Sequence, residues 1–158
     1  MVSNDTALSE DYLLSDINSR IESRLEVQSY LQNLKYALDH GAKVTFQKER
    51  IIDNGRDERY TNKFTVADLF PDEDPVEILK RELRNLSVED YIKTVKDTKF
   101  TNRSEMREFG KVYDRNKDVY IKIRVELLSN YGNHTVFIMS FHYADKPFTD
   151  VTFPYRKI

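Results

Sequence analysis

Residues 118–128, DVYIKIRVELL, decide the fold class of this chain. Apolar and polar side chains alternate along this stretch with a period of two, which is typical of a strand with one buried face. We therefore expect two sets of side chains: a core-facing set of Val119, Ile121, Ile123, Val125 and Leu127, and an outward set of Tyr120, Lys122, Arg124 and Glu126.

Two neighbouring stretches extend this strand into a sheet. Residues 105–114, EMREFGKVYD, come before it, and residues 134–143, HTVFIMSFHY, come after it and are apolar on both faces. Because the connections between the three stretches are short and polar, we expect consecutive antiparallel hairpins. Residues 42–47, AKVTFQ, offer a fourth strand.

The first part of the chain has helical spacing instead. Leucines and isoleucines recur three or four residues apart over 9–40, which predicts one long amphipathic helix from an N-cap at Ser9 to Gly41. Its apolar stripe would pack on the protein's own core, or form the seam of a homodimer or partner complex.

Two further helix starts precede the sheet. Asp74 before Pro75 is a cap followed by a first-turn proline. Ser87 and Asp90 resemble a capping pair, which predicts a short helix over 88–95. We therefore expect an α+β fold in which N-terminal helices pack on an antiparallel sheet of three to four or more strands.

Composition excludes several classes of protein. The 158 residues include no Cys and only three His, so disulfides and thiolate zinc sites are excluded and a transition-metal site is not expected. No apolar run reaches the length of a membrane span, and residues 1–11 lack the features of a signal peptide. We expect a soluble cytoplasmic protein that uses neither a metal nor another cofactor.

The net charge of −2 hides an asymmetry along the chain. Residues 1–40 have 3 Lys+Arg against 7 Asp+Glu, a net of −4, whereas residues 86–158 have 13 against 10, a net of +3. The difference is compatible with random scatter in so charged a chain, or with a basic C-terminal half that binds an anionic partner.

The outward residues of 118–128 are the first candidates for such binding. Lys122 and Arg124 can neutralise phosphate, and Tyr120 can stack on a base or hold a phosphate oxygen. On the next strand, His142 shares its parity with Ser140, Ile138 and Val136, and in a meander Tyr120 and His142 would meet on one face. Alternating Lys, Arg and Glu is also the ordinary pattern of a solvated sheet face.

Three segments taken in order resemble the MqsR family of messenger-RNA-cleaving toxins, which have the RelE-like ribonuclease fold. The first is NLSVEDYIKTV, with Tyr91 and Lys93; the second is KDVYIKIRVEL, with Tyr120-Ile121-Lys122; the third is VFIMSFHYADKPF, with Ser140-Phe141-His142. The resemblance covers roughly 64–146 and is concentrated in 86–143.

The resemblance implies a metal-independent endoribonuclease that a cognate antitoxin neutralises. By position it implies two sets of site residues: a catalytic set of Lys93, Tyr120, His142 and Glu108, and an RNA-binding set of Lys122, Arg124 and Arg107. His142 stands where some family members have Lys, and the alignment around Glu108 is loose. The family's small members have no counterpart of 1–40.

Metal-free RNA cleavage uses the 2′-OH of the substrate as nucleophile, so these residues would share three tasks. His142 would act as general acid or base, because the reference pKa of His is about 6.5. Tyr120 would orient, protonate or stack, and Lys93 and Lys122 would stabilise the charged phosphorane. Glu108 is a candidate base.

This interpretation divides the chain into a helical extension at 1–41, a ribonuclease domain at 42–148 and a C-terminal tail at 149–158. The acidic helix 9–40 would then shield the basic sheet from RNA, or simply pack on the core. Two other functions remain open: a non-enzymatic regulator, encoded by a phage or plasmid, that binds another protein, and a metal-dependent nuclease built on the carboxylates of 72–74.

Overall fold

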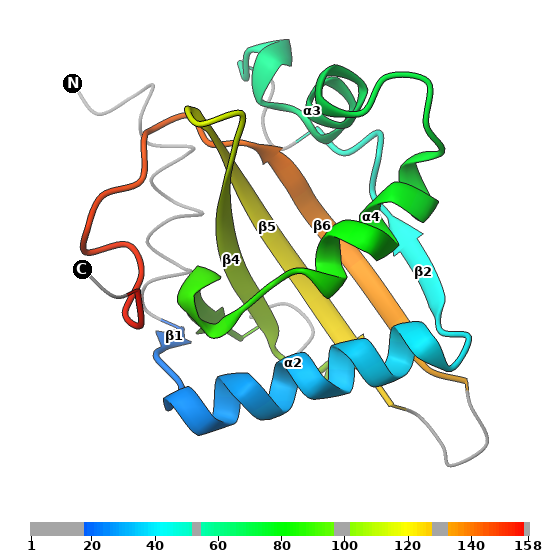
Figure 1. Cartoon of the computed structure of the whole chain (residues 1–158), viewed down its shortest axis with the longest axis vertical. Helices are drawn as coiled ribbons and strands as arrows, with labels where there is room; N and C mark the ends of the chain where they lie inside the picture. Colours follow the sequence, from blue (N-terminus) through cyan, green and yellow to red (C-terminus); the bar gives the residue numbers. More distant parts are fainter. Residues whose placement is uncertain (1–17, 52–54, 97–101, 128–132, 157–158) are drawn as a thin grey trace.

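A computed structural model describes residues 18–51, 55–96, 102–127 and 133–156. Within these residues the fold is α+β, with three helices and one open sheet of six strands in the order β1-β3-β4-β5-β6-β2 (Figure 1). The strands are β1 Ser19–Arg20, β2 Lys43–Phe46, β3 Tyr91–Val95, β4 Met106–Tyr113, β5 Lys117–Glu126 and β6 Thr135–Tyr143.

The predicted antiparallel meander is confirmed. Strands β4, β5 and β6 pair antiparallel in chain order, and Asp114 and Arg115 adopt the positive φ angles (48° and 72°) that a tight turn between β4 and β5 needs. The sheet as a whole is larger than predicted and mixed, because β2 pairs with β6 in parallel. Leu127 was expected in the core, but it lies beyond the end of β5 and is 43% exposed.

The prediction of one helix over 9–40 is wrong in its first half, as far as the described residues reach. The helix α2, Arg24–Asp39, begins at Ser23, whose Oγ accepts a hydrogen bond from the N–H of Glu26 while the Glu26 carboxylate accepts one from the N–H of Ser23. This reciprocal capping box stops the helix from extending upstream. Residues 9–17 lie outside the described residues.

Strand β1 occupies the place where the helix was expected to continue. Ser19 and Arg20 pair with Val95 and Thr94 at the edge of the sheet. Ile21, which the single-helix prediction placed on the apolar stripe, is 56% exposed. The C-terminal end of the helix was predicted correctly, since Gly41 follows it with a φ of 73°.

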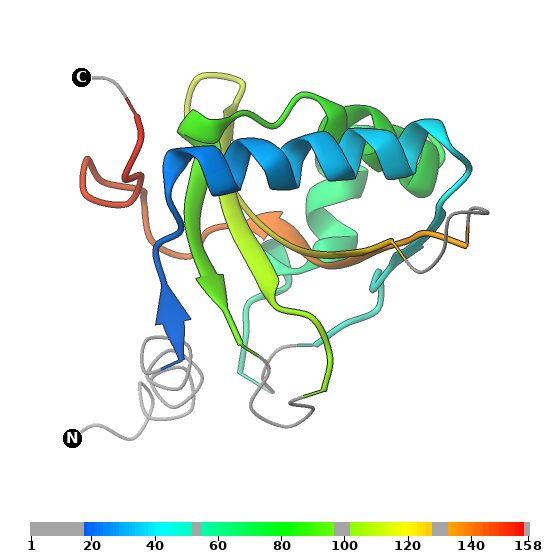
Figure 2. The ribbon, with the colours of Figure 1, turned by 90° about the horizontal axis from the view of Figure 1, so that it is seen from below.

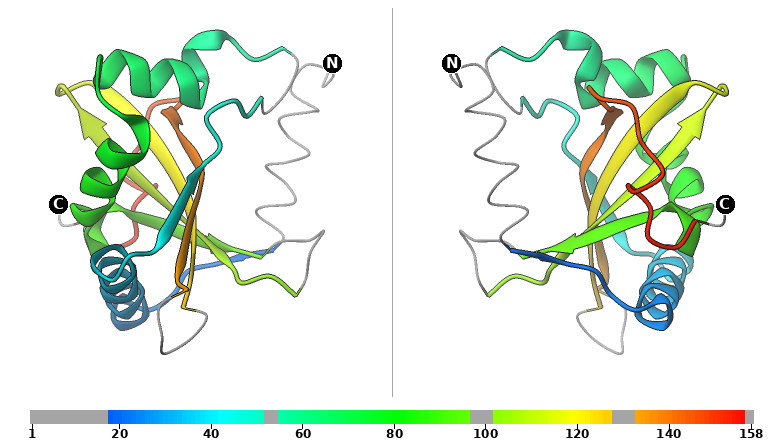
Figure 3. Two further views of the ribbon diagram at one scale, coloured as in Figure 1. Left: turned by 90° about the vertical axis from the view of Figure 1, so that its right-hand side faces the viewer. Right: turned by 90° about the vertical axis from the view of Figure 1, so that its left-hand side faces the viewer.

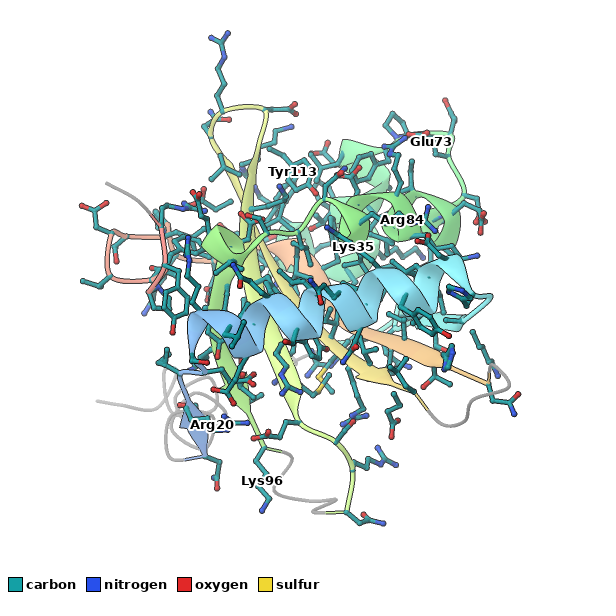
Figure 4. The ribbon with its side chains drawn as sticks, turned by 60° about the horizontal axis from the view of Figure 1, so that its bottom comes forward. Arg20, Lys35, Glu73, Arg84, Lys96 and Tyr113 are labelled. Carbon is teal, nitrogen blue, oxygen red and sulfur yellow. The ribbon has the colours of Figure 1, made fainter. Side chains whose placement is uncertain are left out.

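Helices α2 and α4 lie together on one face of the sheet (Figures 1, 2 and 3). Helix α4, Pro75–Arg84, begins as predicted at Asp74, which accepts a hydrogen bond from the N–H of Glu77. At its other end Arg84, labelled in Figure 4, forms an ion pair of 2.9 Å with Asp39 of α2. One hydrophobic core under these helices contains side chains of α2, α4 and strands β3 to β6.

The predicted helix over 88–95 is wrong. Ser87 and Asp90 do form the capping pair, but it opens only the 3-10 turn Val88–Asp90, and the chain then enters β3. The Tyr91 ring is fully buried and packs edge-on against Phe109, 5.9 Å between centroids. Burial of this ring on the sheet outweighs the helical signal of the cap.

Helix α3, Asn62–Leu69, closes the edge of β6 beyond the end of β2. The Asn62 side chain accepts a hydrogen bond from the N–H of Phe141 (2.9 Å) and donates one to the carbonyl of Met139 (2.9 Å). Thr65 accepts a third from the N–H of Tyr143 (2.9 Å). These side chains replace the hydrogen bonds that a longer β2 would make.

The C-terminal residues 148–156 form a strap that runs back beside β4 (Figures 1 and 2). Phe153 is 4% exposed and contacts Phe148, with ring centroids 5.2 Å apart. Tyr155 stacks on Tyr91, and its hydroxyl donates to the carbonyl of Glu22. The strap and α2 therefore belong to the same folded body as the sheet.

None of the helices in the described part of the chain combines the length and the hydrophobicity needed to cross a lipid bilayer.

Candidate functional site

The face of the sheet turned away from α2 and α4 carries most of the residues singled out from the sequence. We call it the polar face and define it by these residues: Lys93, Glu108, Gly110, Tyr120, Lys122, Arg124, Ser140 and His142. Residues directly opposite one another on paired strands project to the same side, so the strand register alone brings these side chains together.

Two rows cross the polar face. In the first, Glu108 lies opposite both Lys93 and Lys122, and Lys122 lies opposite Ser140. In the second row, Tyr120 lies opposite His142. The two rows are adjacent, because Tyr120 and Lys122 are two residues apart on β5.

An irregularity in β6 makes this arrangement possible, and it corrects one prediction. The register shifts so that Lys122 pairs with Ser140 while Ile123 pairs with Ile138, which leaves Met139 as an extra residue. The alternation of β6 is thereby reversed: Ile138 belongs to the hydrophobic core, whereas Ser140 and His142 project to the other face. Val136 and Ile138 are both in the core, so the expectation that Ser140 and His142 share their face is wrong.

Tyr120 and His142 are in contact as expected. Their ring centroids are 5.4 Å apart and the rings are tilted by 40°. His142 is 5% exposed, and its Nδ1 lies 2.9 Å from the carbonyl oxygen of Tyr143. Since a carbonyl only accepts, Nδ1 carries the proton, and the lone pair of Nε2 is left without a hydrogen-bond partner.

Burial keeps this imidazole neutral. Loss of hydration, with the positive charges of Arg56 and Arg50 as smaller causes, lowers the pKa of His142 to about 4. At pH 7 the ring therefore donates from Nδ1 and can accept a proton at Nε2. A neutral ring has the protonation state that the expected role of base requires.

Tyr120 has the opposite character. Burial, followed by the charge of Glu108 and a hydrogen bond to Glu108, raises the pKa of Tyr120 well above its usual value. The phenol therefore keeps its proton at every physiological pH and donates it in the hydrogen bond to Glu108. Nearby cations do not convert Tyr120 into a base.

Glu108 links the two rows. Its side chain is 3% exposed, and its carboxylate lies 4.0 Å from the ammonium of Lys122. Lys93, opposite it on β3, is half-buried. Lys93, Tyr120 and His142 thus lie on one face, with Glu108 between Lys93 and Tyr120.

The structure separates the two arginines expected to bind RNA. Arg124 is on the polar face, but it is 6% exposed, its Nε donates to the carbonyl of Ser104 (3.1 Å) and its guanidinium lies over Phe137. Arg107 is on the helix-covered face, where it donates to the buried carboxylate of Glu22 (2.8 Å). Arg107 is therefore not part of the candidate site.

Sequence reasoning missed two cations that approach this site from outside the sheet. Arg50 follows β2, and its Nη1 donates to the hydroxyl of Ser140 (3.2 Å). Arg56 is close enough to His142 to influence its titration. Both are in a polar connection whose sequence has no periodicity, so no local signal could place them.

A pocket of about 280 Å³ opens beside the end of β6. It is lined by Arg59, Tyr60, Asn116, Lys117, Asp118, Tyr143, Ala144, Asp145 and Pro147. Lys117 is already near two carboxylates, Asp68 and Asp114, each 3.5 Å away. The pocket is thus electrostatically balanced and does not favour an anion.

Among the described residues no group of three His, Asp or Glu side chains is arranged to hold a metal ion. Asp74, one of the three carboxylates considered for a metal site, is the N-cap of α4.

Comparison with known proteins found no matching family model, no matching curated protein and no matching solved structure.

Proposed function

We propose that this chain is a metal-independent endoribonuclease, with its catalytic centre on the polar face. The observation that carries the proposal is the contact between Tyr120, a proton donor, and His142, a proton acceptor, beside the Lys93-Glu108-Lys122 row. A proton donor, a proton acceptor and cations within one site are what cleavage by the substrate's 2′-OH requires. The RelE-like fold and the antitoxin that the MqsR resemblance implies are part of the proposal.

The reaction proceeds by attack of the 2′-oxygen on the adjacent phosphorus. Nε2 of His142 accepts the 2′-hydroxyl proton, and the neighbouring phosphate anion stabilises the imidazolium that results. The bond from phosphorus to the 5′-oxygen breaks, and that oxygen takes up the proton of Tyr120, which Glu108 orients. Lys122 and Lys93 stabilise the charge that builds up on the phosphoryl oxygens.

The test is cleavage of RNA by the purified full chain in EDTA. The expected products have 2′,3′-cyclic phosphate and 5′-hydroxyl ends, because the nucleophile belongs to the substrate. Intact RNA after prolonged incubation at pH 7 to 8, with a broad pool of messenger sequences as substrate, would remove the proposal. Products with 5′-phosphate ends would also contradict it.

A second candidate is a non-enzymatic protein that binds another protein. The observation in its favour is that charged side chains of the sheet interact within the protein and not with solvent. Arg107 pairs with Glu22, Arg124 donates to the carbonyl of Ser104, and Glu108 is buried. Induced expression separates the two candidates. A nuclease toxin arrests growth and loses this effect in His142→Ala, whereas a binding protein gives the same phenotype with and without the imidazole.

A further inference from the structure

The chain that leaves β2 brings a guanidinium onto the polar face. Arg50 donates from Nη1 to the hydroxyl of Ser140, at 3.2 Å. Ser140 is 1% exposed, lies opposite Lys122 and precedes His142 by two residues on β6. A hydrogen bond to so buried a hydroxyl fixes the arginine at one place on the sheet.

The charge of the same arginine acts on both rings of the Tyr120–His142 contact. Burial dominates the pKa of both rings, and the positive charge of Arg50 opposes the rise for Tyr120 and adds to the fall for His142, as does the charge of Arg56. Lys122, by contrast, lies 4.0 Å from the carboxylate of Glu108, which offsets its charge. Arg50 and Arg56 are therefore two cations that act on the Tyr120–His142 contact from outside the sheet.

The chemistry of guanidinium suggests what this potential is for. Its planar fork of N–H donors matches two oxygens of a phosphate, and it keeps its charge at any physiological pH. The lone pair on Nε2 of His142 is buried without a hydrogen-bond partner. This costs folding free energy unless the hydroxyl of a ligand donates a hydrogen bond to it.

The geometry points to a phosphodiester-binding site formed by Arg50 and Arg56 next to Tyr120 and His142, with single-stranded RNA as its ligand. The inference rests on the proposed ribonuclease activity and deepens it. Arg50 and Arg56 bind the non-bridging oxygens of the scissile phosphate, and this holds the 2′-hydroxyl at Nε2 of His142. As both arginines touch the substrate, they are catalytic residues of the reaction.

The binding test uses 2′-deoxy hexanucleotides of mixed sequence, which cannot be cleaved through a 2′-oxygen. We expect Arg50→Ala and Arg56→Ala to raise the Kd at least tenfold. Arg50→Lys should have a smaller effect, because lysine keeps the positive charge and loses only the planar fork of donors. The matched control is Arg59→Ala, from the same connection, since Arg59 acts on Asp68 and Tyr143 rather than on His142. Its Kd should stay within twofold of wild type.

A second readout follows the His142 imidazole by NMR. The charged and polar groups that face this ring are Arg50, Arg56, Asp145 and Tyr120. Arg50→Ala should raise the pKa of His142 in the free protein, and the hexanucleotide should raise it in wild type. A merely structural role of Arg50 predicts neither the fall in affinity nor the response of His142 to the probe.

The outcomes separate this inference from the proposed function. Loss of hexanucleotide binding in both alanine variants, in a protein that never cleaves RNA, supports the phosphodiester site and removes the ribonuclease. RNA cleavage and binding that are unchanged in Arg50→Ala and Arg56→Ala overturn the site and leave the ribonuclease standing. Hexanucleotide binding that is equally weak in wild type and in both variants also overturns the site.

Discussion

His142 is buried as a neutral imidazole, and this makes folding stability depend on pH. Its pKa is about 4 in the folded protein, against about 6.5 for an exposed histidine. Between these values the unfolded chain binds the proton and the folded chain does not. The stability that this group contributes is therefore complete above pH 6.5 and is lost as the pH falls from 6.5 toward 4.

A glutamine at this position should remove that dependence. Between pH 7.5 and pH 5.0, wild type should lose about 2 kcal/mol more unfolding free energy than His142→Gln. Urea unfolding at the two pH values measures the difference. His40→Gln is the control, because it removes an exposed imidazole in place of a buried one. Equal pH dependence of wild type and His142→Gln contradicts the neutral, buried imidazole.

The Tyr120 hydroxyl is the other residue whose role can be isolated. Tyr120→Phe keeps the ring beside His142 but removes the proton donor and its hydrogen bond to Glu108. We expect RNA cleavage to slow by about 10²-fold or more, in the range of a lost general acid. Tyr36→Phe, at a 48% exposed position on α2, should cleave at the wild-type rate. Equal rates for both variants would exclude Tyr120 from the reaction.

Residues of the site differ in how far the sequence could predict them. Tyr120 and His142 follow from strand periodicity plus hairpin order, since opposite residues on neighbouring strands must meet. Arg50 could not be predicted, because its position depends on where an aperiodic connection crosses the sheet. The reversed alternation in β6 could not be predicted either. In HTVFIMSFHY both the odd-numbered and the even-numbered positions carry apolar side chains, so the sequence does not show which set faces the core.

At the scale of elements, the buried carboxylate of Glu22 holds three parts of the fold together. Arg107 of β4 donates to it from Nε (2.8 Å) and Nη2 (3.2 Å), and Thr94 of β3 donates a third hydrogen bond. Burial would raise the pKa of Glu22, but these hydrogen bonds and the charge of Arg107 outweigh it, so the pKa lies below its usual value. Tyr155 of the C-terminal strap binds the carbonyl of the same residue.

Glu22→Gln should therefore destabilise the protein strongly. The amide leaves the Arg107 guanidinium with only the more distant carboxylate of Glu105 (3.9 Å) as counter-charge. Breaking a buried pair in this way costs roughly 3–5 kcal/mol. Because the folded-state pKa of Glu22 is depressed, this stabilisation is present above about pH 4.5 and is lost as the pH falls further. Urea unfolding at pH 7 measures the loss. Glu49→Gln, at an exposed ion pair with Lys63, should change stability by less than about 0.5 kcal/mol.

Gly110 determines where the C-terminal strap can lie. A Cβ at this position would come within 2.8 Å of the Phe148 ring and 2.9 Å of the Phe153 ring. Alanine normally stabilises a strand relative to glycine. At Gly110 we expect the reverse, a loss of about 1–3 kcal/mol, because both rings must move.

A double-mutant cycle with Phe148→Ala checks this explanation. Removing the Phe148 ring should reduce the cost of Gly110→Ala, because the Cβ then has room. If Gly110→Ala costs the same free energy with and without the Phe148 ring, the contact is not the cause.

Local rules predicted some elements and not others. Helix α4 was predicted from its cap and proline, and the capping box at Ser23 was present in the sequence as a serine followed three residues later by a glutamate. The stripe of leucines and isoleucines that continues upstream of Ser23 concealed it. Strand β3 was not predicted, because its extended conformation depends on burying Tyr91 against Phe109 of β4, which comes later in the chain.

At the scale of the whole molecule, α2 is a structural part of the ribonuclease candidate and not an extension of it. Leu34 and Val27 of α2 are at most 1% exposed in the core that also holds Ile121 and Phe141 of the sheet. Deletion of residues 1–40 would therefore open the core and could not test shielding of the sheet. The α+β class was predictable from the switch of period along the chain, whereas the mixed six-strand order depends on contacts between distant segments.

We propose that the Tyr120–His142 pair on the polar face cleaves RNA without a metal. The most direct measurement is the single-turnover cleavage rate in EDTA for wild type, His142→Ala and His40→Ala, with the fold of each confirmed by circular dichroism. We expect a rate for His142→Ala at least about 10²-fold below wild type, and a wild-type rate for His40→Ala. A folded His142→Ala protein that cleaves as fast as wild type would contradict it.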